Sequence, residues 1–275
     1  MQSLSRQTGG NGVSYVHRAG EGAPFVLLHG IGSRGHSFLP FIEALPASAT
    51  VIAWDAPGYG ASVPLAQDWP LALDYAAALE ALLAELHIER AILVGHSLGT
   101  LMAASHARHF GGRLSGLVLM SPAPGYGVPA GGPMSDVARA RLDEFETLGP
   151  QGYAAKRAPQ LVHEPARRRD LVAELTRTMA TMRQPGYGQG ARMLASGQLL
   201  DDAAQVALPC LILCGEEDAI TPPALARRVE AARGAGSPHA ETRLALLPDA
   251  GHMIYLEATK TVAAELLKFA ATMGA

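Results

Sequence analysis

Residues 91–100 read Ala-Ile-Leu-Val-Gly-His-Ser-Leu-Gly-Thr, and this stretch decides the fold. Residues 92–94 predict a fully buried strand, and the residues after Ser97 predict a helix that begins at once. The chain must therefore reverse on Ser97 itself, which holds this residue in a strained backbone conformation. Side chains at positions 95 and 99 would collide with the neighbouring backbone, so Gly95 and Gly99 fit the turn.

The predicted turn gives the Ser97 hydroxyl a chemical role. It lifts the hydroxyl off the sheet and points the first free N–H groups of the following helix, with their partial positive charge, at whatever the hydroxyl attacks. This is an oxyanion site in outline. The alternative is a plain glycine-rich turn, because the short pattern Gly-x-Ser-x-Gly also occurs by chance. The strand before the serine and the helix after it favour a nucleophile.

Composition limits the classes of protein and partner. The chain has 275 residues, of which 48% are hydrophobic and 17% charged. These values suit a well-packed globular protein with one α/β domain and an insertion, or with two small domains. The formal net charge of −3 provides no basic field, so the expected partner is a small-molecule substrate, with no nucleic acid and no membrane. A homodimer is left open.

The expected location follows from the N-terminus and from the apolar runs. Residues 1–7 lack the apolar core of a signal peptide. No apolar run reaches the roughly 20 residues that a membrane span needs. The sequence therefore predicts a cytoplasmic protein.

The two cysteines, Cys210 and Cys214, lie in one apolar run over residues 208–214. Four strand steps of about 3.3 Å place them roughly 13 Å apart, which is too far for a disulfide. We expect both thiols to pack in the core, the alternative being a redox or metal-binding role.

Strands and helices alternate along most of the chain. Buried strands are predicted at residues 24–30, 50–54, 92–94, 114–120, 210–215 and 242–247, after an antiparallel edge strand at 12–17; helices are predicted at 38–45, 71–86, 98–104, 224–232 and 258–273. Such alternation pairs the strands in parallel and places helices on both faces. The predicted class is α/β, with a doubly wound, mostly parallel sheet.

The alternation stops for about eighty residues between positions 121 and 208, too long for an ordinary connection. Helical patterns fill this insertion, at residues 135–148, 151–162, 167–183 and 189–200. We predict that residues 122–207 form a helical cap over the carboxyl edge of the sheet. Residues 1–121 and 208–275 then form the core.

Two further side chains are expected near Ser97. Open α/β sheets place their sites at the carboxyl ends of the strands. Serine is a weak nucleophile at neutral pH and needs a base, which a carboxylate in turn orients. Asp218 follows the predicted strand at 210–215, and His252 follows the strand at 242–247. These three residues are the candidate catalytic set.

Other residues compete for the same roles. Glu216 and Glu217 are alternatives to the acid, because they lie in the same loop as Asp218. His96 is next to the nucleophile but points away from it in a one-residue turn, so we expect a structural role. His29 ends a predicted strand, and we expect it to shape the following loop through hydrogen bonds without chemistry of its own.

Five motifs along the chain carry a resemblance to a known family. They are His29-Gly30, Asp-Ala-Pro-Gly-Tyr-Gly-Ala-Ser at 55–62, Gly-His-Ser-Leu-Gly at 95–99, Gly-Glu-Glu-Asp at 215–218 with the residues that follow through Pro222, and Gly251-His252. Through these motifs the chain resembles the α/β-hydrolase superfamily over nearly its whole length. Epoxide hydrolases and haloalkane dehalogenases of this fold carry an aspartate where this chain has Ser97, which argues against both.

The resemblance implies a role for each matching residue. It implies Ser97 as the nucleophile, His252 as general base and then general acid, and Asp218 as the carboxylate that orients the imidazole. It implies the backbone N–H groups of Ile31 and Leu98 as the oxyanion hole. The reaction that it implies is acyl transfer through an acyl-enzyme, for which we expect no metal and no organic cofactor.

The passage from cap to core, residues 185–201, is similar to that of oxoadipate enol-lactonase-type members. This resemblance implies a carboxylic ester or lactone of a small molecule as substrate, with an acidic product of aromatic degradation as one option. Arg34 is a candidate for holding a substrate carboxylate, against a solvated loop charge. Tyr187 and Met193 are candidates for lining an acyl pocket, against packing within the cap.

Two other functions stay open. The first is a carbon–carbon bond hydrolase that acts on ring-cleavage products with the same three residues. The second is a non-catalytic receptor that binds a small molecule in the same pocket of the same fold. A complete set of serine, acid and histidine at the strand ends argues against the receptor, which needs none of them.

Overall fold

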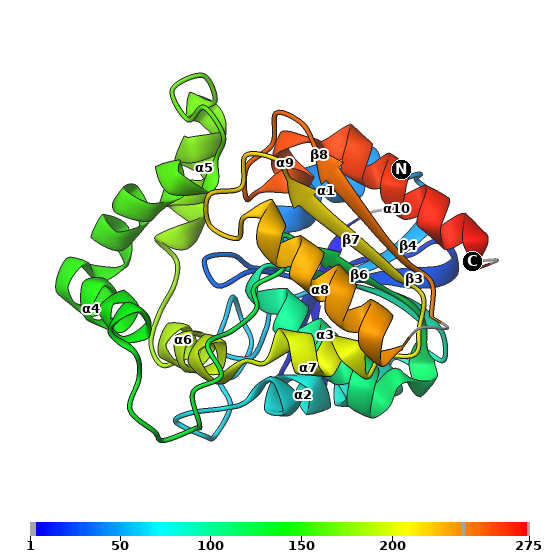
Figure 1. The fold of residues 1–275 in the computed structure, drawn as a ribbon, viewed down its shortest axis with the longest axis horizontal. Coiled ribbons are helices and arrows are strands. Elements are labelled where there is room, and N and C mark those ends of the chain that lie inside the picture. Colours follow the sequence, from blue (N-terminus) through cyan, green and yellow to red (C-terminus); the bar gives the residue numbers. More distant parts are fainter. Residues whose placement is uncertain (1–3, 238–239, 274–275) are drawn as a thin grey trace.

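The structure, a computed structural model, describes residues 4–237 and 240–273 (Figure 1). Within these residues one sheet has eight strands, in the order β1-β2-β4-β3-β5-β6-β7-β8. From β4 to β8 along this order the neighbouring strands pair in parallel, whereas β1 and β2 pair antiparallel at one edge. The bounds are β1 Ser5–Thr8, β2 Ser14–Arg18, β3 Glu21–Leu28, β4 Ala49–Trp54, β5 Ala91–His96, β6 Leu114–Met120, β7 Cys210–Gly215 and β8 Thr242–Leu247.

This architecture confirms the predicted α/β class with a mostly parallel sheet. One detail of the sheet differs from the prediction, because β2 is not an edge strand. β1 pairs outside it, with Ser5 opposite His17. Residues 5–8 are mostly exposed and carry no alternation of apolar and polar side chains, so their pattern contains no strand signal.

Helices cover both faces of the sheet (Figure 1). On one face, α2 and α3 pack with α8 against side chains such as Leu93 of β5. On the other face, α1, α9 and α10 pack against Ile92 and Val94 of the same strand. Both faces are thus apolar, as a parallel sheet requires. The bounds are α1 Leu39–Ala44, α2 Ala72–Glu85, α3 Leu98–Phe110, α8 Pro223–Gly236, α9 Ile254–Glu257 and α10 Thr259–Thr272, with the 3₁₀ turns η1 Gly35–Phe38 and η2 Gly111–Arg113.

The insertion between β6 and β7 is helical in the structure. Its α4 is interrupted at Gly149, whose φ of 64° and ψ of 172° are not helical, so α4 consists of two helical pieces that meet at the break expected between residues 148 and 151. In Figure 1, α4, α5 and α6 gather at the end of the sheet toward which β7 and β8 point. The bounds are α4 Asp136–Arg157, η3 Ala158–Leu161, α5 Arg169–Met179, α6 Gly186–Ser196 and α7 Leu199–Ala204.

The last helix of the insertion has a different environment. α7 packs on α3 and α8, two of the helices that cover the sheet, and away from α4 and α5. The boundary between core and cap at residue 207 therefore stays a prediction. Both cysteines of β7, Cys210 and Cys214, are buried free thiols, as predicted. No helix in the described ranges combines the length and the apolar character that crossing a bilayer requires.

Candidate active site

Ser97 occupies the sharp turn between β5 and α3. Its backbone has φ 51° and ψ −117°, which confirms the strained reversal expected from the sequence. A Cβ atom at Gly95 would lie 2.5 Å from the carbonyl oxygen of Gly99, and one at Gly99 would lie 2.3 Å from the carbonyl oxygen of Leu28. No real side chain tolerates such contacts. The turn therefore requires glycine at both positions, for steric reasons.

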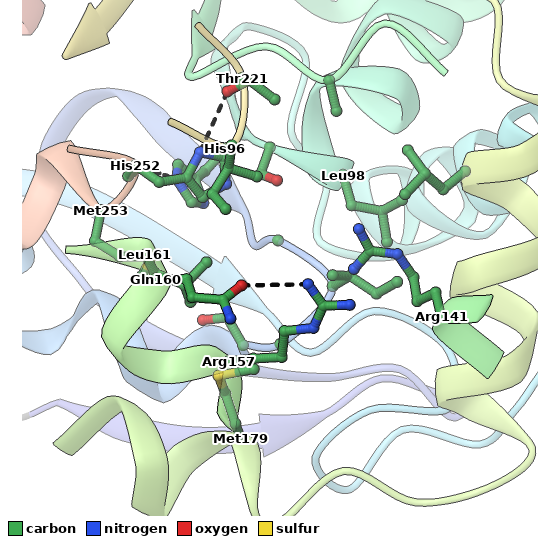
Figure 2. A pocket seen from close by; sticks show the side chains of 18 of the residues that line it. His96, Leu98, Arg141, Arg157, Gln160, Leu161, Met179, Thr221, His252 and Met253 are labelled. Carbon is green, nitrogen blue, oxygen red and sulfur yellow. Dashed lines mark hydrogen bonds between the residues drawn. The ribbon is translucent and has the colours of Figure 1, made fainter. Parts of the chain in front are cut away.

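Ser97 opens into a cavity between the sheet edge and the inserted helices (Figure 2). His252 lines the same cavity, together with Ile31 and Leu98. The inserted segment contributes Tyr153, Leu161, Met179 and Tyr187, among others. The cavity thus joins residues that lie far apart along the chain.

His252 and Asp218 form a close buried pair. The Nδ1 atom of His252 lies 2.9 Å from Oδ2 and 3.1 Å from Oδ1 of Asp218. Because an ionised carboxylate only accepts hydrogen bonds, Nδ1 carries the proton and Nε2 keeps a free lone pair. Thr221 Oγ1 lies 3.2 Å from the same Nδ1 (Figure 2). The same hydroxyl donates to Asp218 Oδ2 at 2.9 Å. The imidazole is therefore in the tautomer that accepts a proton at Nε2.

Asp218 is ionised over the whole ordinary pH range. Burial by itself raises its pKa, but hydrogen bonding to His252 and to Thr221 outweighs burial and lowers the pKa to about 2. The backbone N–H groups of Ile220 and Thr221 add two hydrogen bonds to Oδ1, at 2.9 and 2.8 Å. A fixed negative charge of this kind stabilises an imidazolium on His252.

No hydrogen bond links Ser97 Oγ to His252 within the described part of the chain. Both groups face the same cavity. Hydrogen bonds of this kind are often longer than usual before substrate binds, and they shorten in the complex with substrate. The structure thus brings Asp218 and His252 into contact, and it places Ser97 and His252 in the lining of one cavity.

His96 holds the backbone of His252 in place. Its Nε2–H donates to the carbonyl oxygen of His252 at 2.9 Å, and Ser121 Oγ donates to the same oxygen at 3.1 Å. Burial, together with the neighbouring His252, lowers the pKa of His96 to about 3, so the ring is neutral. This arrangement agrees with the structural role expected for His96.

His29 fixes the loop that leads to Ile31. Its Nδ1–H donates to the carbonyl oxygen of Gly30 at 2.8 Å, and its Nε2 accepts from the backbone N–H of Ala56 at 3.0 Å. The expected loop-shaping role is therefore seen. Neither Ile31 nor Leu98 donates its backbone N–H to another described residue, and both line the cavity. Their assignment as an oxyanion hole stays a prediction.

Of the three candidate substrate-binding residues, one lines the cavity and two do not. Tyr187 lines the cavity. Met193 does not: it is fully buried in the apolar cluster that contains Leu101 and Met102. Arg34 is also outside the lining, and its Nε is buried without a hydrogen-bond partner among the described residues. Helix α6 turns Tyr187 toward the cavity and Met193 into the apolar cluster that includes α3, a distinction that the sequence pattern does not contain.

Several site residues were missed by sequence reasoning. Arg141, Arg157 and Gln160 reach the cavity from the inserted helices (Figure 2). All three lie in a segment that is mostly polar, so no pattern marked the face turned toward the cavity. Thr221 was also missed, although the hydroxyl of a residue near Asp218 is a weak signal for a carboxylate partner.

Glu257 was missed as well, and it anchors the His252 loop. Its side chain is fully buried and accepts from the backbone N–H groups of Gly251 at 3.1 Å and Met253 at 3.0 Å. It also accepts from the N–H of His163 at 2.8 Å and pairs with Arg168 at 3.2 Å, both from the insertion. One carboxylate therefore ties the loop that carries His252 to the inserted helices.

Comparison with known proteins identifies the family. The model of the alpha/beta hydrolase family matches residues 25–265, which is most of the chain. The chain belongs to the alpha/beta hydrolase family and is an enzyme of that class.

Two relatives that match over most of the chain are identical to it at fewer than a third of the aligned positions. The chain is 30% identical to the dihydrolipoyllysine-residue acetyltransferase component of an acetoin cleaving system from Pseudomonas putida, over 272 residues that cover 96% of this chain and 68% of the relative. It is 28% identical to the pimeloyl-[acyl-carrier protein] methyl ester esterase of Vibrio atlanticus, over 93% and 97% of the two chains.

Among solved structures, the enol-lactonase from Burkholderia xenovorans LB400 superposes with a TM-score of 0.82. The aligned region covers 95% of this chain and 98% of that chain, at 22% sequence identity. At this level of identity the similarity shows the fold.

Proposed function

We propose that the protein is a serine hydrolase that cleaves a carboxylic ester or lactone of a small molecule through an acyl-enzyme. Ser97 is the nucleophile, His252 the general base and acid, and Asp218 the orienting carboxylate. The observation that carries this proposal is the buried Asp218–His252 pair, 2.9 Å between Oδ2 and Nδ1, whose histidine lines the same cavity as a serine held at a positive φ.

The proposed reaction begins with proton transfer from Ser97 to His252. Asp218 holds the proton on Nδ1, so the lone pair on Nε2 takes the hydroxyl proton as Oγ attacks the carbonyl carbon. The negative charge that develops on the carbonyl oxygen is stabilised by the N–H groups of Leu98 and Ile31, and each such donor contributes about 10²–10³ in rate.

The second half of the cycle uses the same groups in reverse. His252 gives its proton to the leaving alcohol, or to the ring oxygen of a lactone, and the acyl group stays on Ser97. A water molecule then loses a proton to His252 and attacks the acyl carbon, which releases the acid and restores the serine.

The names of the relatives support this chemistry. The Vibrio relative is a methyl ester esterase, and the structural neighbour from Burkholderia is an enol-lactonase. Both names describe hydrolysis at an acyl carbon, which agrees with a serine nucleophile beside two candidate oxyanion donors.

The test is covalent labelling at the proposed nucleophile. The native chain is incubated with a fluorophosphonate probe and with p-nitrophenyl butyrate, and Ser97→Ala is treated in parallel. We expect the probe on the peptide that contains Ser97, and loss of both labelling and turnover in Ser97→Ala, because no other nucleophile is activated by His252. The matched control is Ser115→Ala, a part-buried serine of β6 whose hydroxyl bonds to a backbone carbonyl.

Three results would contradict the proposal. Labelling of Ser97→Ala at the level of the native chain would place the nucleophile elsewhere. Turnover of vinylogous diketones without turnover of any ester or enol-lactone would indicate carbon–carbon bond hydrolysis. Tight binding of an ester with no product after long incubation would indicate a receptor.

A further inference from the structure

Arg141 is a cation in the cavity without an anionic partner. It lies on α4, is partly buried and lines the same space as Ser97 and His252. Within residues 4–237 and 240–273, no carboxylate lies within 4.0 Å of its guanidinium. The hydrogen bond from its Nη1 to the hydroxyl oxygen of Tyr153 is long, at 3.4 Å. Most of its five N–H donors therefore remain available to a ligand.

Arg157 provides an internal comparison, because it lines the same cavity and is paired with a carboxylate, Glu144, which also pairs with Lys156. Its Nη2 lies 2.7 Å from Glu144 Oε2, its Nε donates to the same oxygen at 2.8 Å, and its Nη1 donates to Gln160. Figure 2 shows both guanidinium groups reaching into the cavity, Arg157 bonded to Gln160 and Arg141 near Leu98. The fold thus supplies a counter-charge for one arginine and none for the other.

The position of Arg141 is set by an aromatic cluster. Tyr187 donates to the hydroxyl of Tyr153 at 2.7 Å, and the ring of Tyr187 stacks on Phe145 with centroids 4.0 Å apart. The hydroxyl of Tyr187 also lies 3.4 Å from the backbone carbonyl of Arg141. These contacts fix the backbone carbonyl of Arg141 and the Tyr153 hydroxyl, which lies beside the guanidinium.

The rest of the lining makes an unpaired cation costly. Among the described residues, no aspartate or glutamate lines the cavity, and leucine, methionine and tyrosine side chains form much of its wall. Removing a charge from water without a partner is unfavourable, and an anion brought into the same apolar space restores the balance. Arginine also pairs with a carboxylate through two parallel hydrogen bonds.

We propose that Arg141 binds a carboxylate of the substrate, so that this enzyme prefers esters or lactones that carry a free carboxylate distant from the carbonyl attacked by Ser97. This inference rests on the proposed function and adds the substrate class to it. Arg141 is a binding residue, and the chemical steps at Ser97 and His252 are unchanged.

The test compares acidic and neutral esters that are otherwise alike. The acidic substrates are mono-p-nitrophenyl glutarate and mono-p-nitrophenyl adipate. The neutral counterparts carry a methyl ketone in place of the free carboxylate. The chains are the native protein, Arg141→Gln and Arg141→Lys, and the control is Arg139→Gln, which removes the same charge from an exposed position of α4.

We expect the native chain to favour the acidic esters in kcat/KM. Arg141→Gln lowers kcat/KM for the acidic esters by about tenfold to a hundredfold, since a hydrogen-bonded charge contributes about 1.5–3 kcal/mol, and leaves the ketones within about twofold. Arg141→Lys recovers part of the preference, because it restores the charge without the planar fork. Arg139→Gln behaves as the native chain. Free glutarate inhibits turnover of a ketone ester in the native chain and less in Arg141→Gln.

Several results would overturn the inference. Equal kcat/KM for acidic and neutral esters in the native chain would do so, and so would a parallel loss of both in Arg141→Gln. If Arg141→Gln does not fold, unchanged selectivity and unchanged glutarate inhibition in Arg141→Lys would also count against a carboxylate fork. If Ser97 reacts with the fluorophosphonate while selectivity is absent, only this inference fails. If Ser97 does not react and no ester turns over, the proposed function fails with it.

Discussion

Ser97 owes its position to its glycine neighbours more than to its own hydrogen bonds. Its φ of 51° brings Gly95 close to the backbone of Gly99, and brings Gly99 close to the end of β3. A residue with a positive φ and a side chain costs free energy, and the surrounding structure must enforce it. The buried strand and the helix that meet at Ser97 provide that enforcement.

Adding a single methyl group at Gly99 is therefore expected to lower the stability of the fold strongly. Gly99→Ala places a Cβ 2.3 Å from the carbonyl oxygen of Leu28, so β3 or α3 must shift. We expect Gly99→Ala to lower the free energy of unfolding by about 3 kcal/mol or more, as severe overpacking does. Urea unfolding followed by circular dichroism measures it.

The control for this substitution is Gly112→Ala. No atom lies within 4 Å of a Cβ built at Gly112, and its φ is not positive. A small change at Gly112 beside a large one at Gly99 supports the steric account. Equal losses at the two positions would attribute the effect to glycine replacement in general.

Among the elements of the fold, the loop between β8 and α9 is held by hydrogen bonds from several distant segments. His96 and Ser121 hold the carbonyl of His252, Leu161 of η3 accepts its N–H at 3.0 Å, and Glu257 holds the residues on both sides. The imidazole is therefore positioned from β5, from β6 and from the insertion at once.

Glu257→Gln tests whether this loop controls catalysis. The amide cannot accept at both ends, so at least one buried N–H of Gly251, Met253 or His163 loses its partner, and the Arg168 ion pair is lost. Each buried donor left unpaired costs about 1–3 kcal/mol. We expect a lower free energy of unfolding by this amount, together with a lower kcat and little change in KM, measured with p-nitrophenyl butyrate.

Glu89→Gln is the control for Glu257→Gln, because Glu89 is an exposed carboxylate that also pairs with an arginine, Arg113. Exposed pairs of this kind contribute little to stability, so we expect native stability and kcat. A Glu257→Gln enzyme with native kcat would show that the carboxylate stabilises the fold without positioning His252.

The sequence predicts elements well where the pattern is local. The strands at Ala91–His96, Leu114–Met120 and Cys210–Gly215 were all expected, because buried parallel strands are continuous apolar runs. β1 was missed because its residues are polar, and it forms a strand through its pairing with β2. The kink in α4 was expected only as a gap between two helices, at Gly149 and Pro150.

For the whole molecule, buried neutral histidines link stability to pH. Burial holds the pKa of His96 at about 3 in the folded chain, against about 6.5 in an unfolded chain. Between these values the unfolded state binds one more proton, so stability rises with pH. The contribution of His96 is complete above pH 6.5 and is lost as the pH falls from about 6.5 toward 3.

This linkage predicts that replacing His96 makes the free energy of unfolding depend less steeply on pH. We expect the free energy of unfolding of the native chain to fall as the pH is lowered from 6.5 to 4. In His96→Phe the slope of the free energy of unfolding against pH is smaller by up to about 1.4 kcal/mol per pH unit, which is the value for one bound proton. Urea titrations at several pH values measure it. The control is His109→Phe at an exposed position of α3, and an equal slope in the native chain and His96→Phe would refute the prediction.

The sequence by itself determined the sheet class, the elbow and the three candidate catalytic residues. Each of these depends on neighbours in the chain: an apolar run, two glycines beside Ser97, or a loop that follows a strand. Only the tertiary structure decided which side of α4 turns Arg141 into the cavity, that Met193 packs in the apolar cluster with α3, and that Glu257 joins the His252 loop to the insertion. Those facts depend on how distant segments pack, and a polar helix carries the same local pattern whichever face meets the cavity.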